Sequence, residues 1–207
     1  MLKDLFRPVL CDRTIMKYNR KGILIKEPIS SFQLQPNSVD LTLADSWKLI
    51  RTNSNFKGTS VIDPKMEILY KEGKFHDGKK RSLFEDAKYF VLQPGEFVLL
   101  ASRETLNIPN GIISFVQGRS SIARLAIQTE QAGLIDSGFK GTITFEVYNQ
   151  SKYPIILYEG MRIAQVYFFK SQYADAIYGS YLKGKYSGQI EATGSKINHD
   201  FILDKED

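Results

Sequence analysis

Short runs of β-branched and aromatic residues recur along this chain, and turn pairs such as Pro94-Gly95 and Glu159-Gly160 separate many of them. Runs of this length and composition are typical of strands in antiparallel sheets. Few segments suggest helices, so we expect a mainly β fold, a sandwich or distorted antiparallel β-barrel with short helices. The expected strands cover 22–25, 38–43, 47–50, 89–92, 97–100, 112–116, 142–148, 155–158 and 161–169.

Two segments predict short helices. Asp12 can cap a helix over 13–21 that Gly22 would end, and 120–125 suggests a second helical turn. From 51 to 88 the strand pattern weakens into Asn, Lys, Gly and Ser, with a strongly basic stretch at 71–81. We expect a surface excursion there, carried by a single domain over 1–207.

The counts of Cys and His restrict the chemistry. The chain has one Cys and two His in 207 residues, whereas a structural zinc site needs four such ligands and zinc deaminases need a Cys pair. A zinc centre is therefore excluded. The formal net charge of +5 favours anionic partners but is small for a nucleic-acid-binding tail.

No stretch approaches the roughly 18 consecutive apolar residues of a membrane span. The segment Met1–Arg7 lacks the apolar core of a signal peptide. We therefore expect a cytoplasmic protein with neither a membrane nor a nucleic acid as partner.

The segment 117–125 has the composition of an anion site. Gly118 lets backbone approach a ligand, Ser120 and Ser121 offer hydroxyls at a helix start, and two arginines offer fork-shaped donors. These groups suit a phosphate. A capped turn with solvated arginines explains the same residues equally well.

Two further clusters follow along the chain. The glycine-rich segment 131–141 places Asp136 and Phe139 in a sharply bent loop, which is either a plain turn or a place where a ligand approaches the backbone. In the strand 142–148, alternation puts Glu146 on the same face as Thr144 and Tyr148. Glu146 is either a solvated outer residue or, in a closed site, a group that moves protons to and from water.

Together these clusters resemble the successive motifs of the dCTP deaminase branch of the trimeric dUTPase superfamily. The similar segments are 35–41, 119–125, 132–141, 143–146, 159–165 and 184–189. The resemblance covers most of the chain and leaves 51–88 uncovered. It implies a dUTPase-like homotrimer with sites at subunit interfaces, in which residues from about 178 to 207 close over the nucleotide.

The resemblance also implies roles for individual residues. Residues 119–124 would contact the triphosphate, Asp136 the deoxyribose, and residues 144–146 the pyrimidine. The implied nucleotide-binding residues are Arg119, Ser120, Ser121, Arg124, Asp136, Thr144, Phe145, Glu146, Gln165, Tyr178, Lys185 and Gln189.

The implied reaction is zinc-independent deamination of dCTP to dUTP and ammonia. Glu146 would act as general acid/base on a water that attacks C4 of cytosine, while Ser120 and Arg124 position that water. Mg²⁺ would be held through the triphosphate rather than by protein ligands.

Several residues depart from the family pattern and leave alternatives open. Gln131 replaces a common Thr, which leaves feedback by dTTP open, and Ser137 replaces a common Pro and Ala126 a frequent Gly. Gly133 and Gln165 match a bifunctional subgroup that continues to dUMP and diphosphate. A catalytically idle nucleotide-sensing or protein-binding member, using the basic stretch as its contact surface, is the alternative from another class.

Overall fold

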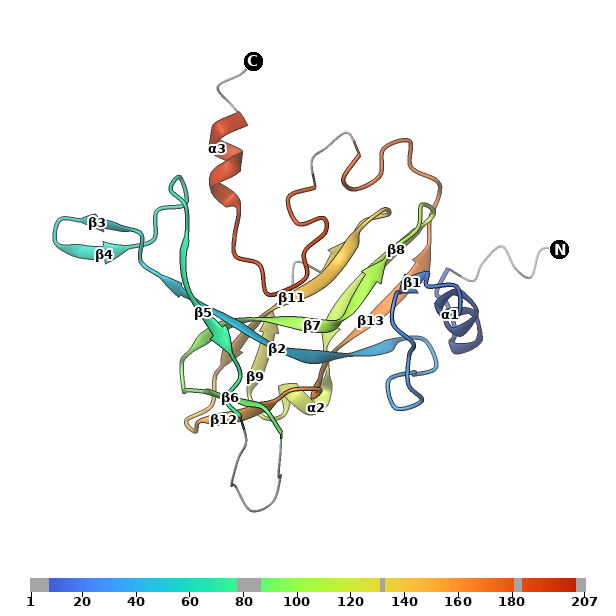
Figure 1. The fold of residues 1–207 in the computed structure, drawn as a ribbon, viewed down its shortest axis with the longest axis horizontal. Coiled ribbons are helices and arrows are strands. Elements are labelled where there is room, and N and C mark those ends of the chain that lie inside the picture. The colour runs from blue at the N-terminus through green and yellow to red at the C-terminus, as the bar shows by residue number, and fades with distance from the viewer. Residues whose placement is uncertain (1–7, 78–86, 131–132, 181–183, 204–207) are drawn as a thin grey trace.

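The computed structural model describes residues 8–77, 87–130, 133–180 and 184–203 (Figure 1). Within these ranges the helices are α1 (Asp12–Asn19), α2 (Ser120–Ala123) and α3 (Asp200–Leu203), with the 3-10 helix η1 (Ile197–His199). The strands are β1 (Leu24–Ile25), β2 (Val39–Arg51), β3 (Ser54–Phe56), β4 (Thr59–Val61), β5 (Leu69–Lys74), β6 (Tyr89–Leu92), β7 (Phe97–Asn107), β8 (Ile112–Gly118), β9 (Ile127–Glu130), β10 (Leu134–Ile135), β11 (Lys140–Asn149), β12 (Ile155–Tyr158) and β13 (Arg162–Lys170).

The main sheet is antiparallel and strongly curled (Figure 1). Its strands lie in the order β10-β8-β13-β2-β7-β11-β9, while β5 pairs with β2 and β1 pairs with β7. Separate ladders join β6 to β12 and β3 to β4. The expectation of a mainly β, distorted barrel-like fold with short helices is confirmed.

The core lies inside the curl of this sheet. Alternate residues of the long strands point inward, as the period of two in a strand requires. Leu41, Leu100, Phe145 and Phe168, one from each of β2, β7, β11 and β13, have no exposed surface. Burying a side chain of this size contributes about 1.5–3 kcal/mol, so these strands are held rigidly against one another.

The segments expected as strands at 38–43 and 47–50 form one strand, β2. The register of its pairing with β7 shifts between Leu43 and Trp47. This irregularity accommodates Asp45, whose carboxylate lies 2.6 Å from Lys88 Nζ and 3.3 Å from Lys74 Nζ. The hydrogen bond from Lys88 lowers the pKa of Asp45. The polar interruption in the sequence therefore marks an ion pair inside a continuous strand.

The first helix differs from expectation at both ends. Its N-cap is Cys11, so Asp12 lies in the first turn and not at the cap. The helix stops at Asn19, and Gly22, with φ of 66°, belongs to the turn that follows. The sequence did not predict β9 and β10, because both are short: β9 is mostly polar, and β10 has only two residues and follows a glycine.

The range 51–88 contains β3, β4 and β5 among its described residues. The β3–β4 hairpin extends away from the sheet, whereas β5 pairs with β2 over Leu69 to Lys74 (Figure 1). Gly73 of β5 lies against the indole of Trp47, where a Cβ atom would come within 2.7 Å of a ring carbon. The end of the basic stretch, 78–81, lies outside the described residues.

The turn between α2 and β9 contains a strained residue. Ala126 has φ of 57°, the left-handed region that side chains with a Cβ atom rarely adopt. Its carbonyl accepts a hydrogen bond from Gln150 N at 2.9 Å, which fixes this turn against the end of β11. A glycine is frequent here in the family that the motifs resemble, and the backbone explains why.

Replacing Ala126 with Gly should raise the free energy of unfolding by about 0.5–1 kcal/mol, because left-handed backbone costs more with a Cβ atom than Gly loses in entropy. Urea denaturation measures the change. Ala123→Gly, in the right-handed turn of α2, is the matched control and should lower the same quantity by roughly 0.5–1 kcal/mol. Two losses of equal size would contradict the assignment of strain to Ala126.

Candidate active site

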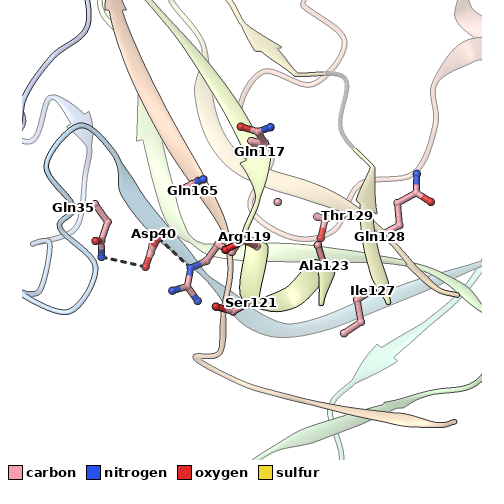
Figure 2. A pocket seen from close by; sticks show the side chains of 12 residues that line it. Gln35, Asp40, Gln117, Arg119, Ser121, Ala123, Ile127, Gln128, Thr129 and Gln165 are labelled. Carbon is pink, nitrogen blue, oxygen red and sulfur yellow. Dashed lines mark hydrogen bonds and ion pairs between the residues drawn. The ribbon is translucent and has the colours of Figure 1, made fainter. Parts of the chain in front are cut away.

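Two pockets hold most of the residues that the motifs single out. The first, here called the arginine pocket, has a volume of about 630 Å³ (Figure 2). It is lined by Gln35, Asp40, Gln117, Gly118, Arg119, Ser120, Ser121, Ala123, Ile127, Gln128, Thr129 and Gln165. The second, the carboxylate pocket, has a volume of about 410 Å³ and contains Asp136 and Glu146.

A buried carboxylate organises the arginine pocket. Asp40 on β2 is almost fully buried, and one of its oxygens lies 3.3 Å from Arg119 Nε (Figure 2). Its other oxygen lies 3.1 Å from Arg162 Nη1. Arg119 Nη1 also donates to the carbonyl of Arg162 at 3.2 Å. The ion pair with Asp40 and the hydrogen bond to the Arg162 carbonyl together hold the guanidinium of Arg119 in one orientation, with further N–H donors to offer.

Hydroxyls and amides surround this guanidinium. Ser120 and Ser121 are exposed in the first turn of α2, where helix N–H groups lack partners within the helix. Gln165 on β13 pairs with Gln117 on β8, so the two amides lie side by side on the pocket wall. Donors of this kind suit the oxygens of a phosphate chain.

Arg124 is placed differently from the other residues of its motif. It is the C-cap of α2 and is exposed, and it lines neither pocket in the part of the chain that the structure describes.

β11 supplies the floor of the carboxylate pocket. Phe145 and Val147 are buried in the core, while Thr144 and Glu146 are half-buried and line the pocket. The expected alternation is present. The side chain of Phe145 has no exposed surface, so this residue could meet a ligand only through its backbone.

A bulge at the start of this face sets the positions of Thr144 and Glu146. The pairing of β11 with β7 shifts register between Thr142 and Thr144. Ile143 N donates to the Ser102 hydroxyl at 2.8 Å, and that hydroxyl donates to the carbonyl of Glu104 at 2.7 Å. The serine thus satisfies a buried N–H that the irregular ladder would otherwise leave unpaired.

The loop before β11 brings Asp136 to the edge of the same pocket. Ser137 donates to the carbonyl of Ile112 at 2.7 Å, and Tyr178 N donates to the carbonyl of Ser137 at 2.8 Å. Gly138 has φ of 94° and lies against Ile177, where a Cβ atom would come within 2.7 Å. The loop and Tyr178 are therefore packed together, and Asp136 remains exposed at the pocket edge.

Gln189 reaches the pocket from the carboxyl-terminal part of the chain. Its side-chain Nε2 donates to the backbone carbonyl of Thr142 at 2.6 Å, and its backbone carbonyl accepts from Thr142 N at 2.9 Å. The Thr142 carbonyl can only accept, so the side-chain amide of Gln189 must point its NH₂ group at Thr142 and its oxygen Oε1 away from Thr142. Oε1 is buried and has no hydrogen-bond partner among the described residues.

Lys185 lines neither of the two pockets among the described residues, and it forms an ion pair with Asp200 of α3. It shares a third cavity with Asp136 and Tyr178. Gln131, which replaces a common Thr and leaves feedback by dTTP open, lies outside the described residues.

The structure thus divides the expected site residues into two groups. The carboxylate pocket gathers Asp136, Thr144, Glu146, Tyr178 and Gln189. The arginine pocket gathers Arg119, Ser120, Ser121 and Gln165.

The two pockets share no lining residue in the described chain. Val116 lines one and its neighbour Gln117 the other, so the pockets open on opposite faces of β8. One chain therefore does not bring Glu146 and Ser120 together.

The roles of Asp40 and Ser102 were not predicted from the sequence. Charged residues are rarely buried unless they are paired, so the position of Asp40 between Val39 and Leu41 in a buried strand could have predicted an ion pair. Ser102 carries no comparable local signal, because its partner Ile143 lies on another strand.

No group of three or more His, Cys, Asp or Glu side chains among the described residues could hold a metal ion. In the same residues, no helix is long and apolar enough to cross a bilayer.

The sequence model of the dCTP deaminase-like family matches residues 9–171. The chain belongs to the dCTP deaminase-like family. The resemblance carried by the motifs is confirmed.

Two curated relatives of this dCTP deaminase-like protein carry the name dCTP deaminase, dUMP-forming. The one from Hydrogenobaculum sp. (strain Y04AAS1) is 40% identical over 193 residues, covering 93% of this chain and 98% of the relative. The one from Dictyoglomus thermophilum is 38% identical over 202 residues, covering 96% and 99%.

A solved 2′-deoxycytidine 5′-triphosphate deaminase from Agrobacterium tumefaciens has a TM-score of 0.60 at 24% identity. The match covers 79% of this chain and 48% of that chain, and it shows a shared fold.

Ser102→Ala should lower the free energy of unfolding by about 1–3 kcal/mol, because it leaves the buried N–H of Ile143 without an acceptor. Chemical denaturation measures this. Ser114→Ala is the matched control: Ser114 is equally buried, but its hydroxyl has no partner among the described residues, so the loss should stay below about 0.5 kcal/mol. Similar losses in both variants would show that Ser102 acts only by filling space.

Proposed function

We propose that this protein is a dUMP-forming dCTP deaminase, which converts dCTP and two waters to dUMP, diphosphate and ammonia. The main support for this proposal is the carboxylate pocket, which Glu146, Asp136 and Gln189 line together; the side-chain oxygen of Gln189 is a buried acceptor. The names of relatives that match nearly the whole chain support the same activity. We prefer the dUMP-forming reaction to release of dUTP for that reason.

Glu146 is the proposed general acid/base. It would take a proton from the water that attacks C4 of cytosine and deliver protons to N3 and to the departing amine. Its place on β11, between core residues and a ladder on both sides, holds the carboxylate still. Proton transfer of this kind contributes about 10²–10⁴-fold, and orientation by Ser120 and Arg124 supplies part of the remainder.

The acceptors of the carboxylate pocket suit the nucleoside part of the substrate. Asp136 would accept from the deoxyribose hydroxyl, and Thr144, Glu146 and Gln189 would meet the polar edge of the base. Tyr178 packs at 5.7 Å from the ring of Phe139 and offers an aromatic wall. Half-buried acceptors of this kind select a ligand with N–H and O–H donors.

The arginine pocket suits the triphosphate, with Arg119, Ser120, Ser121 and Gln165 as donors. Asp40 is the carboxylate of this pocket and already binds two arginines, so Mg²⁺ would be held by phosphate oxygens and waters, which it prefers. When bound, the ion would neutralise charge on the phosphates. In the second step a water attacks the α-phosphorus, and the bond from that phosphorus to the oxygen between the α- and β-phosphates breaks, which releases diphosphate.

We infer a homotrimer in which each site takes its two pockets from neighbouring copies. Within one chain the pockets open on opposite faces of β8, yet one nucleotide must reach both. The large apolar side chains Leu125 and Leu134, 50% and 48% exposed, lie beside α2 and in the carboxylate pocket. In the proposed trimer a neighbouring copy would cover these side chains.

The remaining expectations stay proposals. They are a single dUTPase-like domain over 1–207, a tail from about 178 that closes over the nucleotide, a cytoplasmic location and feedback by dTTP. A catalytically idle member of the fold is the competing hypothesis, and product analysis separates it from an enzyme.

Incubation with dCTP and Mg²⁺, followed by separation of nucleotides, should yield dUMP and ammonia. Glu146→Gln should still bind dCTP but release ammonia at least about 100-fold more slowly, because the proton acceptor is gone. The exposed Glu67→Gln is the matched control and should keep wild-type activity. Accumulation of dUTP would remove the second step from the proposal, and absence of any product would favour the idle member.

Co-expression of Glu146→Gln and Arg124→Ala chains tests the shared site. Each variant alone should be inactive, whereas trimers that contain both kinds of chain should recover about a third of wild-type activity, because one of their three interfaces then has both native residues. Ammonia release from doubly tagged, purified assemblies measures this. Recovery no greater than the sum of the two variants would place both residues in a site within one chain.

A further inference from the structure

The carboxyl-terminal segment 189–195, here called the strap, is seated on the sheet. Ala192 at its centre is 3% exposed and packs in a small apolar cluster with Leu99 and Ala101 of β7. Tyr70 of β5 packs against the same cluster. A buried alanine in a segment outside the sheet shows that the strap has a built place to dock.

Tyr70 contacts the strap in two ways. Ser195 N donates to the Tyr70 hydroxyl at 2.7 Å. Gly194 lies directly against the phenol ring, where a Cβ atom would come within 2.2 Å of Cε2. Only a glycine leaves room for the ring at this position. Burial raises the pKa of Tyr70, so the hydroxyl stays protonated.

Charged residues of the same region add contacts to the strap and to α3. Lys74 Nζ, at the end of β5, lies 2.7 Å from Glu191 of the strap and 3.3 Å from Asp45 of β2. The ammonium of Lys65 lies 5.6 Å from the centre of the Phe201 ring in α3. Exposed pairs contribute little energy singly, and the pair of Lys74 with Glu191 links the strap to the end of β5.

The other side of the strap reaches the carboxylate pocket. Thr193 N donates to the Thr144 hydroxyl at 3.0 Å, and Gln189 Nε2 donates to the carbonyl of Thr142. Thr144 shares its strand face with Glu146. The strap therefore bridges β5 on one side and the catalytic face of β11 on the other.

We propose that β5 is the docking platform of the strap, and that Tyr70 is a positioning residue which places Gln189 and Thr193 over the carboxylate pocket. This assigns a role to 69–74, a part of the chain that the family motifs do not cover. The docking itself stands on the contacts above, and its kinetic consequence rests on the proposed deaminase function.

Hydrogen exchange on the full-length protein without nucleotide tests the docking. Tyr70→Phe keeps the ring and removes the acceptor, so the strap amides should exchange about fivefold faster. Tyr153→Phe, at a tyrosine that is 75% exposed, is the control and should leave strap exchange unchanged. Unchanged exchange in Tyr70→Phe would overturn the docking platform.

A double-mutant cycle tests the fit between Gly194 and the ring. Gly194 is not in the left-handed region, so the cost of Gly194→Ala comes from the ring of Tyr70. In the native background Gly194→Ala should speed strap exchange more than tenfold, and in a Tyr70→Ala background less than twofold. Equal effects in both backgrounds would show that Tyr70 does not hold the strap. Thermal unfolding confirms that each variant is folded.

Steady-state kinetics with dCTP test the positioning role. Tyr70→Phe should raise KM about fivefold and change kcat less than twofold, because saturating nucleotide restores the docked strap. Faster strap exchange with an unchanged KM would overturn the positioning role. If the native protein released no ammonia from dCTP, the proposed function would fail, and strap exchange alone would then decide the docking.

Discussion

The irregular pairing of β11 with β7 is the constraint on which the candidate site depends. A regular ladder would alternate from Lys140 to Asn149 without interruption, whereas the shift at Thr142 to Thr144 resets the strand. The Ser102 hydroxyl makes this possible by accepting the N–H of Ile143. Phe145 and Val147 then anchor one face in the core, and Thr144 and Glu146 occupy the other.

Charge explains why the binding groups are separated within one chain. The carboxylate pocket contains two acids, whereas Arg119 stands in the arginine pocket with its orientation set by Asp40. A nucleoside needs acceptors for its donors, and a triphosphate needs cations. The two sets line pockets on opposite faces of β8. In the homotrimer proposed above, a neighbouring copy would bring the two sets together around the substrate.

The structure accommodates two residues that depart from the family pattern, Ser137 and Ala126. Ser137, where Pro is usual, donates a hydrogen bond to the carbonyl of Ile112 and so ties down the same loop. Ala126, where Gly is frequent, adopts left-handed backbone at some cost in strain. Neither Ser137 nor Ala126 lines either of the two pockets in the described chain.

The sequence alone determined the β class, most strands, the face of β11 that carries Glu146, and the polar motifs of both pockets. It could do so because alternation, turn residues and motif spacing are properties of neighbours along the chain. It also excluded a zinc centre, because one Cys and two His cannot provide the ligands.

Only the tertiary structure decided that Asp40 holds Arg119, that Ser102 supports the bulge, that β5 completes the sheet, and that one chain keeps Glu146 apart from Ser120. These features depend on pairs far apart in sequence, such as Tyr70 with Ser195 at a separation of 125 residues. Local patterns carry no information on which distant partner a side chain will meet, because packing of the whole sheet selects that partner.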